Sequence, residues 1–225
     1  MKDPAARSVG WRFGVDPLPQ TVEAARRLRT ITGQLLALET AHPEVDELLE
    51  QLRAAEERLA DLVPSDRRPR VGPARSTADA RVYLDHSRDI GAFDPCFPEY
   101  DLTVDGDRAT GTVRFPLAYE GPPGLVHGGF LAVFFDCAMQ HHSCDVGVAG
   151  KTTALSLSYH RPTPLETDLR VQLTRDVAEG PGTAGRITAS GELRRDDELL
   201  CTATMEMVAG RRDRLPEVSP RRLEP

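Results

Sequence analysis

The sequence lacks the features that mark a secreted or membrane-spanning protein. Its 225 residues include one tryptophan and four cysteines, and aromatic residues make up 5% of the chain. The cysteines show no CxxC spacing, which is typical of reduced thiols rather than of a disulfide framework. No apolar run approaches the ~20 residues that a membrane span requires, and the N-terminus has no apolar core of signal-peptide length. We therefore expect a soluble, cytoplasmic protein.

An excess of positive charge is also missing. The formal net charge is −7 and the sequence pI is about 5.4, which argues against a general nucleic-acid-binding protein. Arginines could still form a local patch for a phosphorylated ligand. Hydrophobic residues make up 40% of the chain, which is enough for a sizeable core in one or two domains.

Two amphipathic helices are predicted in the N-terminal part of the chain. Apolar residues recur at three- and four-residue steps over residues 21–39 and again over residues 43–62, where Pro43 suits a first helical position. The short connection predicts an antiparallel hairpin. We favour a hairpin that packs on the main domain or lengthens a dimer interface over a separate recruitment module.

The chain divides into three parts. Residues 1–77 hold an N-terminal arm, the helical hairpin and a linker rich in proline and arginine at 64–77. Residues 78–208 form the main domain, which we expect to open with a short helix at 78–86. Residues 209–225 contain too few apolar groups to fold alone, so they predict a mobile tail.

The main domain shows the two-residue period of β-strands on both sides of one apolar helix. Asp105-Gly106-Asp107 is a hairpin signal between the first two strands. An antiparallel sheet with one apolar face needs a cover, and the helix supplies it, so the fold class is α+β. The predicted strands are residues 100–104, 108–115, 152–160, 168–177, 185–194 and 198–208.

The central helix carries the chemistry. His127-Gly128-Gly129 leads into an apolar run that is interrupted at Asp136. Glycines allow close backbone approach, and the first turn of a helix offers unpaired N–H groups that suit an anion or a developing oxyanion. Carboxylates rarely lie in such apolar surroundings without a partner or a task.

This part of the chain resembles the hotdog-fold acyl-CoA thioesterases, and within them the phenylacetate-pathway (PaaI-type) branch and its animal thioesterase-superfamily relatives. The resemblance covers residues 93–208 and rests on the approach EGPPGxVHGG, on an Asp seven residues after the second Gly, and on Tyr-x-Arg-Pro at the end of the next strand. It implies an antiparallel sheet wrapped around the central helix, hydrolysis of an acyl-CoA and active sites at subunit interfaces. It implies no organic cofactor and no metal.

Thioester hydrolysis needs a group that stabilises the carbonyl oxygen and an attacking oxygen. Gly129 or its neighbour Gly128 can supply the first through a backbone amide, and Asp136 can supply the second as nucleophile or general base. Seven helical residues separate Gly129 from Asp136 by roughly 10 Å, so one helix cannot present both groups to one carbonyl. We therefore expect a homodimer or a dimer of dimers with each site shared between subunits.

Further residues complete the predicted site. The resemblance places a threonine sixteen residues after the Asp, where it holds water or substrate; this is Thr152, although the neighbouring Thr153 leaves the register open by one residue. We assign His127 a positioning role. Arg161 would contact a CoA phosphate, or form a salt bridge at the end of its strand.

Three observations leave alternatives open. Some branches of the family carry an Asn where this chain has Gly121, and others have Asn-Pro where it has Asp94-Pro95. The missing Asn therefore keeps a non-catalytic acyl-CoA binder or assembly protein as an alternative to the hydrolase. A hotdog hydratase or dehydratase is the other alternative, but it normally pairs a carboxylate with a catalytic His, and no such pair is evident at the motif. A polar cluster follows Asp136, and we favour pocket lining or dimer contact for it over a metal site or a Cys-His nucleophile pair. The cluster comprises Cys137, His141, His142, Cys144 and Asp145.

Overall fold

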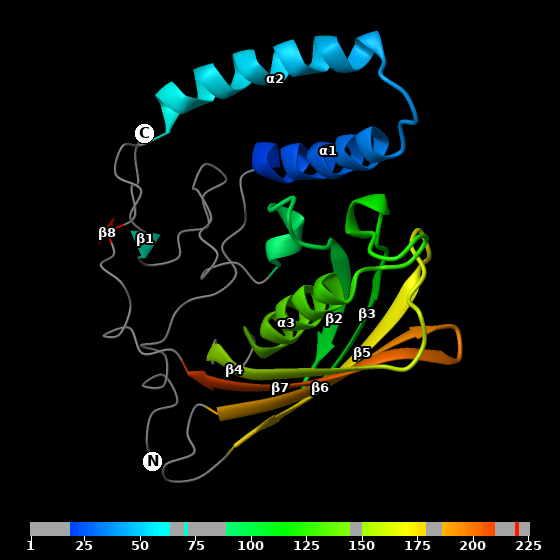
Figure 1. Cartoon of the computed structure of the whole chain (residues 1–225). Coiled ribbons are helices and arrows are strands. Elements are labelled where there is room, and N and C mark those ends of the chain that lie inside the picture. Colours follow the sequence, from blue (N-terminus) through cyan, green and yellow to red (C-terminus); the bar gives the residue numbers. More distant parts are fainter. Residues whose placement is uncertain are drawn as a thin grey trace.

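A six-stranded antiparallel sheet curls around helix α3 (Gly128–Cys144) in the computed structural model of the chain (Figure 1). The structure describes residues 19–63, 70–71, 89–144, 150–178, 186–209 and 219–220. The strands are β2 (Tyr100–Asp105), β3 (Arg108–Val113), β4 (Gly150–Tyr159), β5 (Leu169–Val177), β6 (Arg186–Arg195) and β7 (Glu198–Ala209). Their order across the sheet is β2-β3-β5-β6-β7-β4, so β2 and β4 form its edges.

These six strands confirm the sequence prediction, with ends that differ by one or two residues. Strands β2 and β3 form the expected hairpin, and Gly106 in its turn has a φ of 57°, which glycine adopts without strain. After α3, strands β5, β6 and β7 pair in succession as two hairpins. Strand β4, which precedes them in the chain, pairs with the other side of β7. The predicted α+β class and the single covering helix are therefore confirmed.

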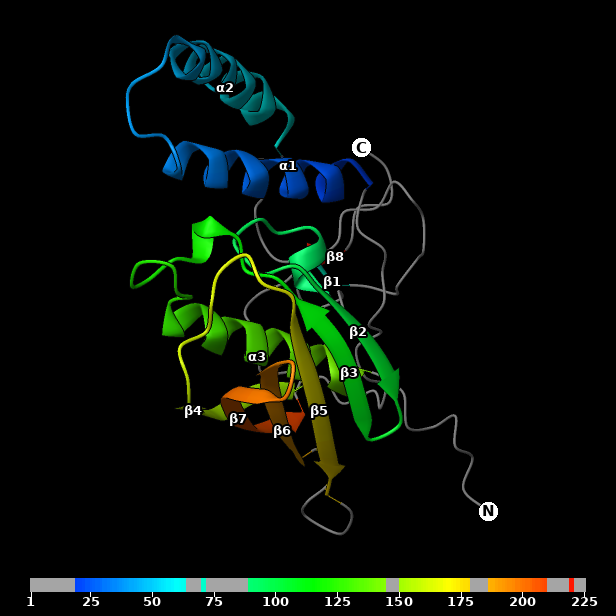
Figure 2. The same ribbon diagram turned by 90° about the vertical axis from the view of Figure 1, so that its right-hand side faces the viewer.

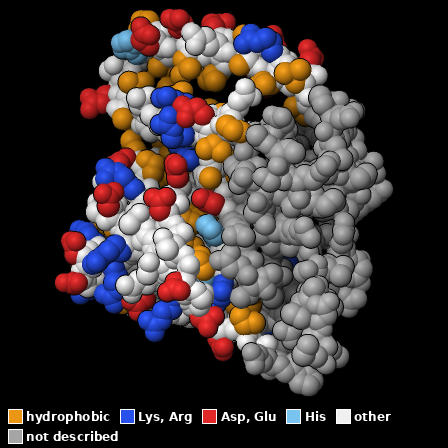
Figure 3. All heavy atoms as spheres, turned by 180° about the vertical axis from the view of Figure 1, so that it is seen from behind, with side chains coloured by type: hydrophobic (Ala, Val, Ile, Leu, Met, Phe, Trp, Pro, Cys, Tyr) orange, Lys and Arg blue, Asp and Glu red, His pale blue; other side chains and the backbone are white. Residues whose placement is uncertain are grey.

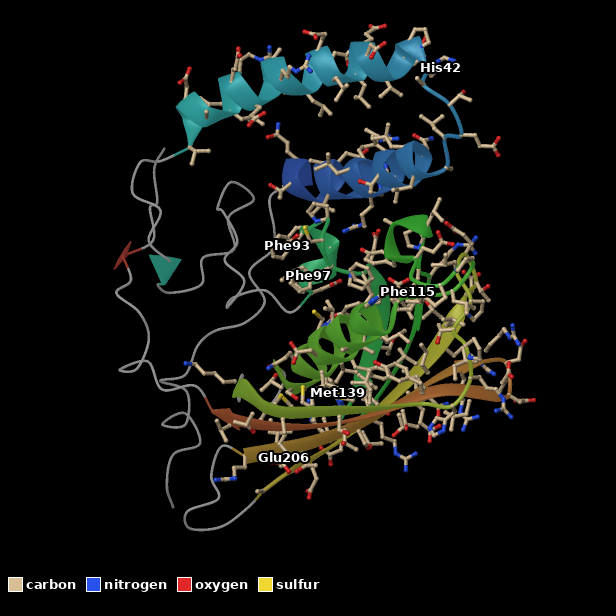
Figure 4. The ribbon with its side chains drawn as sticks, in the orientation of Figure 1. His42, Phe93, Phe97, Phe115, Met139 and Glu206 are labelled. Atoms are coloured by element: carbon tan, nitrogen blue, oxygen red, sulfur yellow. The ribbon has the colours of Figure 1, made fainter. Side chains whose placement is uncertain are left out.

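The core lies between α3 and the concave face of the sheet. Buried and exposed residues alternate along β5, and its buried side chains Leu169, Val171 and Leu173 face the helix. Met139 of α3 points toward the sheet, whereas Glu206 of β7 points away from it into solvent (Figure 4). One face of the sheet is thus apolar and covered, and the other is polar.

Two buried polar residues fasten the C-terminal end of α3. The His142 ring lies 3.2 Å from the Gly106 carbonyl through Nε2, and the Arg175 guanidinium donates a hydrogen bond to the His142 carbonyl. Arg175 Nε also lies 3.8 Å from Asp107 Oδ1. A cation at a helix C-terminus stabilises carbonyls that have no partner within the helix. The turn of the β2–β3 hairpin and the helix end are thereby held together.

The N-terminal helices α1 (Pro19–Leu36) and α2 (Pro43–Leu62) confirm the predicted hairpin, with α2 running back over α1 (Figure 1). Helix α2 begins at the expected Pro43, where His42 Nδ1 accepts a hydrogen bond from the Glu44 N–H at 3.2 Å. No residue of α2 is buried. Apolar side chains gather where the two helices face each other (Figure 3).

Among the described elements, α1 makes the main contacts of the hairpin with the domain. It rests on the short 3₁₀ helices η3 (Ile90–Ala92) and η4 (Leu117–Tyr119) (Figure 2). Ala25 is buried in this contact, and the Arg29 guanidinium donates to the Asp94 carbonyl at 3.0 Å and to Glu99 Oε2 at 3.1 Å. The hairpin therefore packs on the main domain, as we expected, through one buried arginine.

A short parallel pair joins two distant parts of the chain: β1 (Arg70–Val71) lies beside β8 (Ser219–Pro220). The rest of the predicted linker and tail, the N-terminal arm and the helix expected at 78–86 lie outside the described residues. Within the described part of the chain, no helix has both the length and the apolar character to cross a membrane.

Gly191 of β6 should be intolerant of any larger residue. A Cβ atom at this position would lie 2.7 Å from a Leu173 methyl, and 2.9 Å from the Met139 methyl and from a Phe135 ring carbon. We expect Gly191→Val to lower the free energy of unfolding by about 1–3 kcal/mol through overpacking, measured by urea denaturation.

The matched control is Gly33→Ala in α1, where a Cβ would meet nothing within 4 Å. This change should raise stability by about 0.5–1 kcal/mol, because alanine has the higher helix propensity. Equal effects of the two substitutions would contradict the tight helix–sheet contact at Gly191.

Candidate active site

The first turn of α3 is shaped by His127. Its N–H donates to the Tyr119 carbonyl at 2.9 Å, and its Nδ1 accepts from the Gly129 N–H at 3.0 Å. The side chain therefore caps the helix, as Ser or Asp does at other helix starts. Since Nδ1 accepts in this arrangement, the ring proton of a neutral His127 lies on Nε2.

Gly121 lies directly against this histidine. A Cβ atom on Gly121 would be 2.8 Å from His127 Cα and 2.9 Å from His127 Cβ, so this backbone leaves no room for a side chain. The Gly121 N–H donates to the Leu125 carbonyl at 2.9 Å and closes the turn. Some family branches carry an Asn at this position, and in this chain Gly121 replaces it where the turn approaches His127 closely.

The amide that remains available at this helix end is that of Gly128. The Gly129 N–H is taken by His127 Nδ1, and the Phe130 N–H donates to the His127 carbonyl at 2.9 Å. Among the described residues, the Gly128 N–H has no hydrogen-bond acceptor. Of the two glycine amides that the sequence left as alternatives, Gly128 is therefore the one that can bind an oxyanion without losing an existing bond.

Asp136 lies two turns further along α3 and is half-buried rather than buried. Its Oδ1 accepts a hydrogen bond from Thr152 Oγ1 at 2.6 Å, and Thr152 Oγ1 in turn accepts from Gln140 Nε2 at 3.0 Å. Met205 Sδ, a weak acceptor, lies 3.5 Å from the same hydroxyl.

The direction of these bonds follows from their donors. Thr152 has one hydroxyl proton, and a carboxylate can only accept, so the short contact requires that proton to point at Asp136. Gln140 must then present its amide nitrogen to the hydroxyl. The chain Gln140 to Thr152 to Asp136 therefore fixes one carboxylate oxygen and leaves the other for chemistry.

A β-bulge decides which threonine reaches the acid. Thr152 pairs with Met207 of β7 and Ala154 pairs with the next residue, Glu206, so Thr153 is an extra residue in β4. The extra residue shifts the alternation, so Thr152 shares the helix-facing side of β4 with Leu155 and Leu157, which a regular strand would not allow. Thr153 is exposed, and its hydroxyl donates to the Glu206 carbonyl at 3.1 Å. Of the two threonines, Thr152 is therefore the one that bonds Asp136.

A cleft of about 390 Å³ opens beside the glycine end of the helix. Gly128 and Arg161 both line it, together with Tyr159, whose hydroxyl donates to the Gly128 carbonyl at 3.1 Å. Asp136 and Thr152 are not among its lining residues. One chain therefore places the predicted site residues in two separate groups, one at each end of β4.

Arg161 is exposed in this cleft. Its Nε lies 3.8 Å from Glu198 Oε1, and its side chain is 67% exposed. An exposed ion pair of this length contributes little to stability, so the guanidinium can exchange Glu198 for a ligand phosphate. The position of Arg161 is thus compatible with both expected roles, a salt bridge at the end of its strand and contact with a CoA phosphate.

Within the polar cluster after Asp136, Cys137 is not an activated thiol, and the side chain of Cys144 lies outside the described residues. Burial raises the pKa of the Cys137 thiol to about 12, and the charge of Asp136 adds to the increase. His142 is buried against the β2–β3 turn. In the described part of the chain no three His, Cys, Asp or Glu side chains lie close enough to hold a metal; Asp145 lies outside it.

Solved structures share this architecture. A crystal structure of a thioesterase superfamily protein matches with a TM-score of 0.67 and 26% identity, over 88% of this chain and 100% of its own. The chain has the hotdog fold of the thioesterase superfamily. No model of a known protein family matches it.

Two shorter structures align with about half of this hotdog chain. A phenylacetic acid degradation-related protein from Ralstonia eutropha is 26% identical, with a TM-score of 0.42, over 49% of this chain and 84% of its own. A hypothetical thioesterase protein from Streptococcus pneumoniae, solved with coenzyme A, is 20% identical, with a TM-score of 0.44, over 51% and 91%.

Sequence reasoning missed two residues of the site. Gln140 follows Asp136 by one helical turn, and this spacing could have identified it as a neighbour on the same helix face. Tyr159 belongs to the Tyr-x-Arg-Pro motif, but nothing in the sequence places its hydroxyl on Gly128. That contact depends on how the end of β4 crosses the start of α3.

The environment of the cysteines predicts their reactivity. Burial raises the pKa of Cys137 to about 12 and that of Cys201 to about 11, whereas Cys96 is exposed. A pH of 8 is below the pKa of both buried thiols, so both stay protonated. We therefore expect iodoacetamide to label Cys96 far faster than Cys137 or Cys201. Mass spectrometry of peptides locates the label, and labelling in urea serves as the control. Fast native labelling of Cys137 would restore it as a candidate nucleophile.

Proposed function

We propose that this hotdog protein is an acyl-CoA thioesterase, which hydrolyses a thioester to a carboxylic acid and free CoA. One observation carries the proposal: the half-buried carboxylate of Asp136 is held at 2.6 Å by Thr152, sixteen residues further along the chain. These are the two positions at which the resemblance to the family requires an acid and a hydroxyl. β-Bulges are over-represented next to active sites, where they re-aim a side chain, and a bulge here turns the Thr152 hydroxyl toward the acid.

The chemistry divides between the two groups of residues. The Gly128 N–H, at the positive end of the helix dipole, stabilises the carbonyl oxygen as it gains charge. The free oxygen of Asp136 attacks the carbonyl carbon or takes a proton from the water that does so. The tetrahedral intermediate then collapses and releases the thiolate, which at a pKa of about 8.5 for a free thiol needs no strong general acid. Attack by water gives the carboxylic acid directly, whereas attack by Asp136 leaves a mixed anhydride that a water molecule hydrolyses to the acid and the free carboxylate.

The site requires two subunits. Gly128 and Asp136 are eight residues apart on one helix, about 12 Å at 1.5 Å per residue, and both must approach the same carbonyl to about 3 Å. Strand β4 is an edge strand whose outer N–H and C=O groups are unpaired by any described strand, so it can pair with a copy of itself.

Pairing about a two-fold axis brings the two groups together. Thr152, bonded to Asp136, lies near the start of β4, and Tyr159, bonded to Gly128, lies at its end. In an antiparallel pair the start of one strand lies beside the end of its partner. The Asp136 of one subunit then faces the Gly128 of the other, and two equivalent sites form.

The cleft beside Gly128 would receive the CoA part of the substrate. Its volume of about 390 Å³ lies within the range of small-molecule sites, and Arg161 at its wall suits a phosphate. Thr163 Oγ1 is buried in the same wall without a hydrogen-bond partner among the described residues. A ligand acceptor would satisfy that hydroxyl.

A non-catalytic acyl-CoA binder is the second candidate. The observation that favours it is the close fit of Gly121 against His127, which leaves no space for the Asn that assists the water in some branches. Such a protein would bind acyl-CoA in the same cleft without releasing CoA.

Asp136→Asn should abolish thiol release from acyl-CoAs, because it keeps the side-chain volume but removes the base or nucleophile. We expect a loss of at least about 10²-fold in kcat with binding retained, measured with a thiol reagent on short, long and aromatic acyl-CoAs. Asp176→Asn, an exposed acid on β5, is the control. Unchanged release in Asp136→Asn would sink this mechanism, and a silent wild type that binds acyl-CoA would support the binder.

A mixture of two inactive variants should regain activity if the site is shared. Gly128→Val disables one half of each site and Asp136→Asn disables the other, so a mixed dimer contains one intact site. After unfolding and refolding together, random pairing predicts about a quarter of the wild-type specific activity. Each variant refolded alone is the control. No recovery in a mixture proven by native mass spectrometry to contain heterodimers would place the whole site within one chain.

A further inference from the structure

A second, smaller cavity lies between α1 and the main domain. Its volume is about 150 Å³. Helix α1 contributes one wall and the segment around η4 contributes the other. The polar side chains that line it are Arg26, Arg29, Thr30, Glu99, Arg114 and Tyr119.

Tyr119 presents an unsatisfied donor at this cavity. The residue is 3% exposed, and its hydroxyl has no hydrogen-bond partner among the described residues. The ring is held edge-on between Phe115 and Phe130, at centroid distances of 5.9 and 4.8 Å, so it cannot turn the hydroxyl to solvent. Buried hydroxyls without a partner are rare, and each calls for an explanation.

More cationic than anionic side chains line the cavity. Three arginines line it against one acid, Glu99, which is already bonded to Arg29 at 3.1 Å. The carboxylates that hold Arg26 and Arg114 are not part of the wall; they are Glu23, Glu166 and Asp168.

Arginine donors remain uncommitted there. Arg26 uses Nε and Nη2 for Glu23, and Arg114 uses Nε and Nη1 for Glu166 and Asp168. The remaining Nη1 of Arg26 and Nη2 of Arg114 have no acceptor among the described residues. The uncommitted groups of the wall are thus mainly N–H and O–H donors.

We propose that this cavity binds a small oxyanion, a phosphate or carboxylate group that accepts hydrogen bonds from Tyr119, Arg26 and Arg114. A ligand that only accepts hydrogen bonds satisfies all of these donors at once, which a neutral ligand with its own N–H groups would not. Because Arg26 comes from α1 and Tyr119 from the domain, the bound anion also fastens the helical hairpin to the domain. The proposal does not depend on the thioesterase activity.

The test uses Tyr119→Phe, which removes the hydroxyl alone. In a phosphate-free buffer the variant should have a melting temperature equal to or above that of the wild type, because the hydroxyl has no partner to lose. Titration with inorganic phosphate at constant ionic strength should raise the melting temperature of the wild type. The apparent Kd should be about ten-fold weaker in Tyr119→Phe, as expected for one lost hydrogen bond.

Two comparisons complete the experiment. Arg114→Gln should also weaken the phosphate response, whereas Arg53→Gln, which removes an exposed arginine on α2, should leave it unchanged. Titration with acetate in a parallel series distinguishes a general oxyanion site, stabilised by both anions, from a phosphate-selective one.

Two results would overturn the proposal. If Tyr119→Phe is less stable than the wild type without anions, the hydroxyl is already satisfied within the protein. If neither anion stabilises the wild type more than Tyr119→Phe, the cavity does not bind oxyanions.

Discussion

Helix α3 is apolar on almost every side, and this constraint organises the domain. A helix of this kind is stable in water only when it is covered, and the curled sheet covers it from β2 round to β4. The few polar groups on the helix must then be satisfied locally. His127 caps its start, Arg175 donates to the His142 carbonyl near its end, and Thr152 supplies a hydrogen bond to Asp136. Each of these partners comes from a loop or strand that the helix itself positions.

The pairing of Asp136 with Thr152 links this constraint to chemistry. A carboxylate next to apolar side chains is costly unless hydrogen bonds compensate it, and here one oxygen is compensated while the other is left uncommitted. The bulge at Thr153 is the local distortion that makes the pairing possible, since a regular β4 would turn Thr152 outward. The same strand carries Tyr159 to the glycine end of the helix, so β4 connects both groups of site residues.

The N-terminal helical hairpin buries far less apolar surface than α3 does. Helix α1 meets the domain through the buried Ala25 and Arg29 and through Val22, which packs against Phe93 and Ile90, whereas α2 has no buried residue. All the large hydrophobic side chains recorded as exposed in the described residues, apart from Tyr159, lie between residues 28 and 63. A buried arginine gives orientation more than stability, because its desolvation offsets much of what its hydrogen bonds contribute.

The sequence by itself determined the elements and their order. Each of these signals acts over a few neighbouring residues, so it can be recognised in the sequence directly. They are the two-residue period of the strands, the apolar run of α3, Pro43 at the start of α2 and the Asp-Gly turn. The sequence also singled out Asp136, the glycine pair and a threonine near residue 152. The choice of Thr152 over Thr153, the role of Gln140, the capping of Gly129 by His127 and the separation of the site into two groups were decided by tertiary structure. These features depend on a bulge, on the crossing of β4 and α3, and on side-chain directions, all of which arise only when segments distant in sequence pack together.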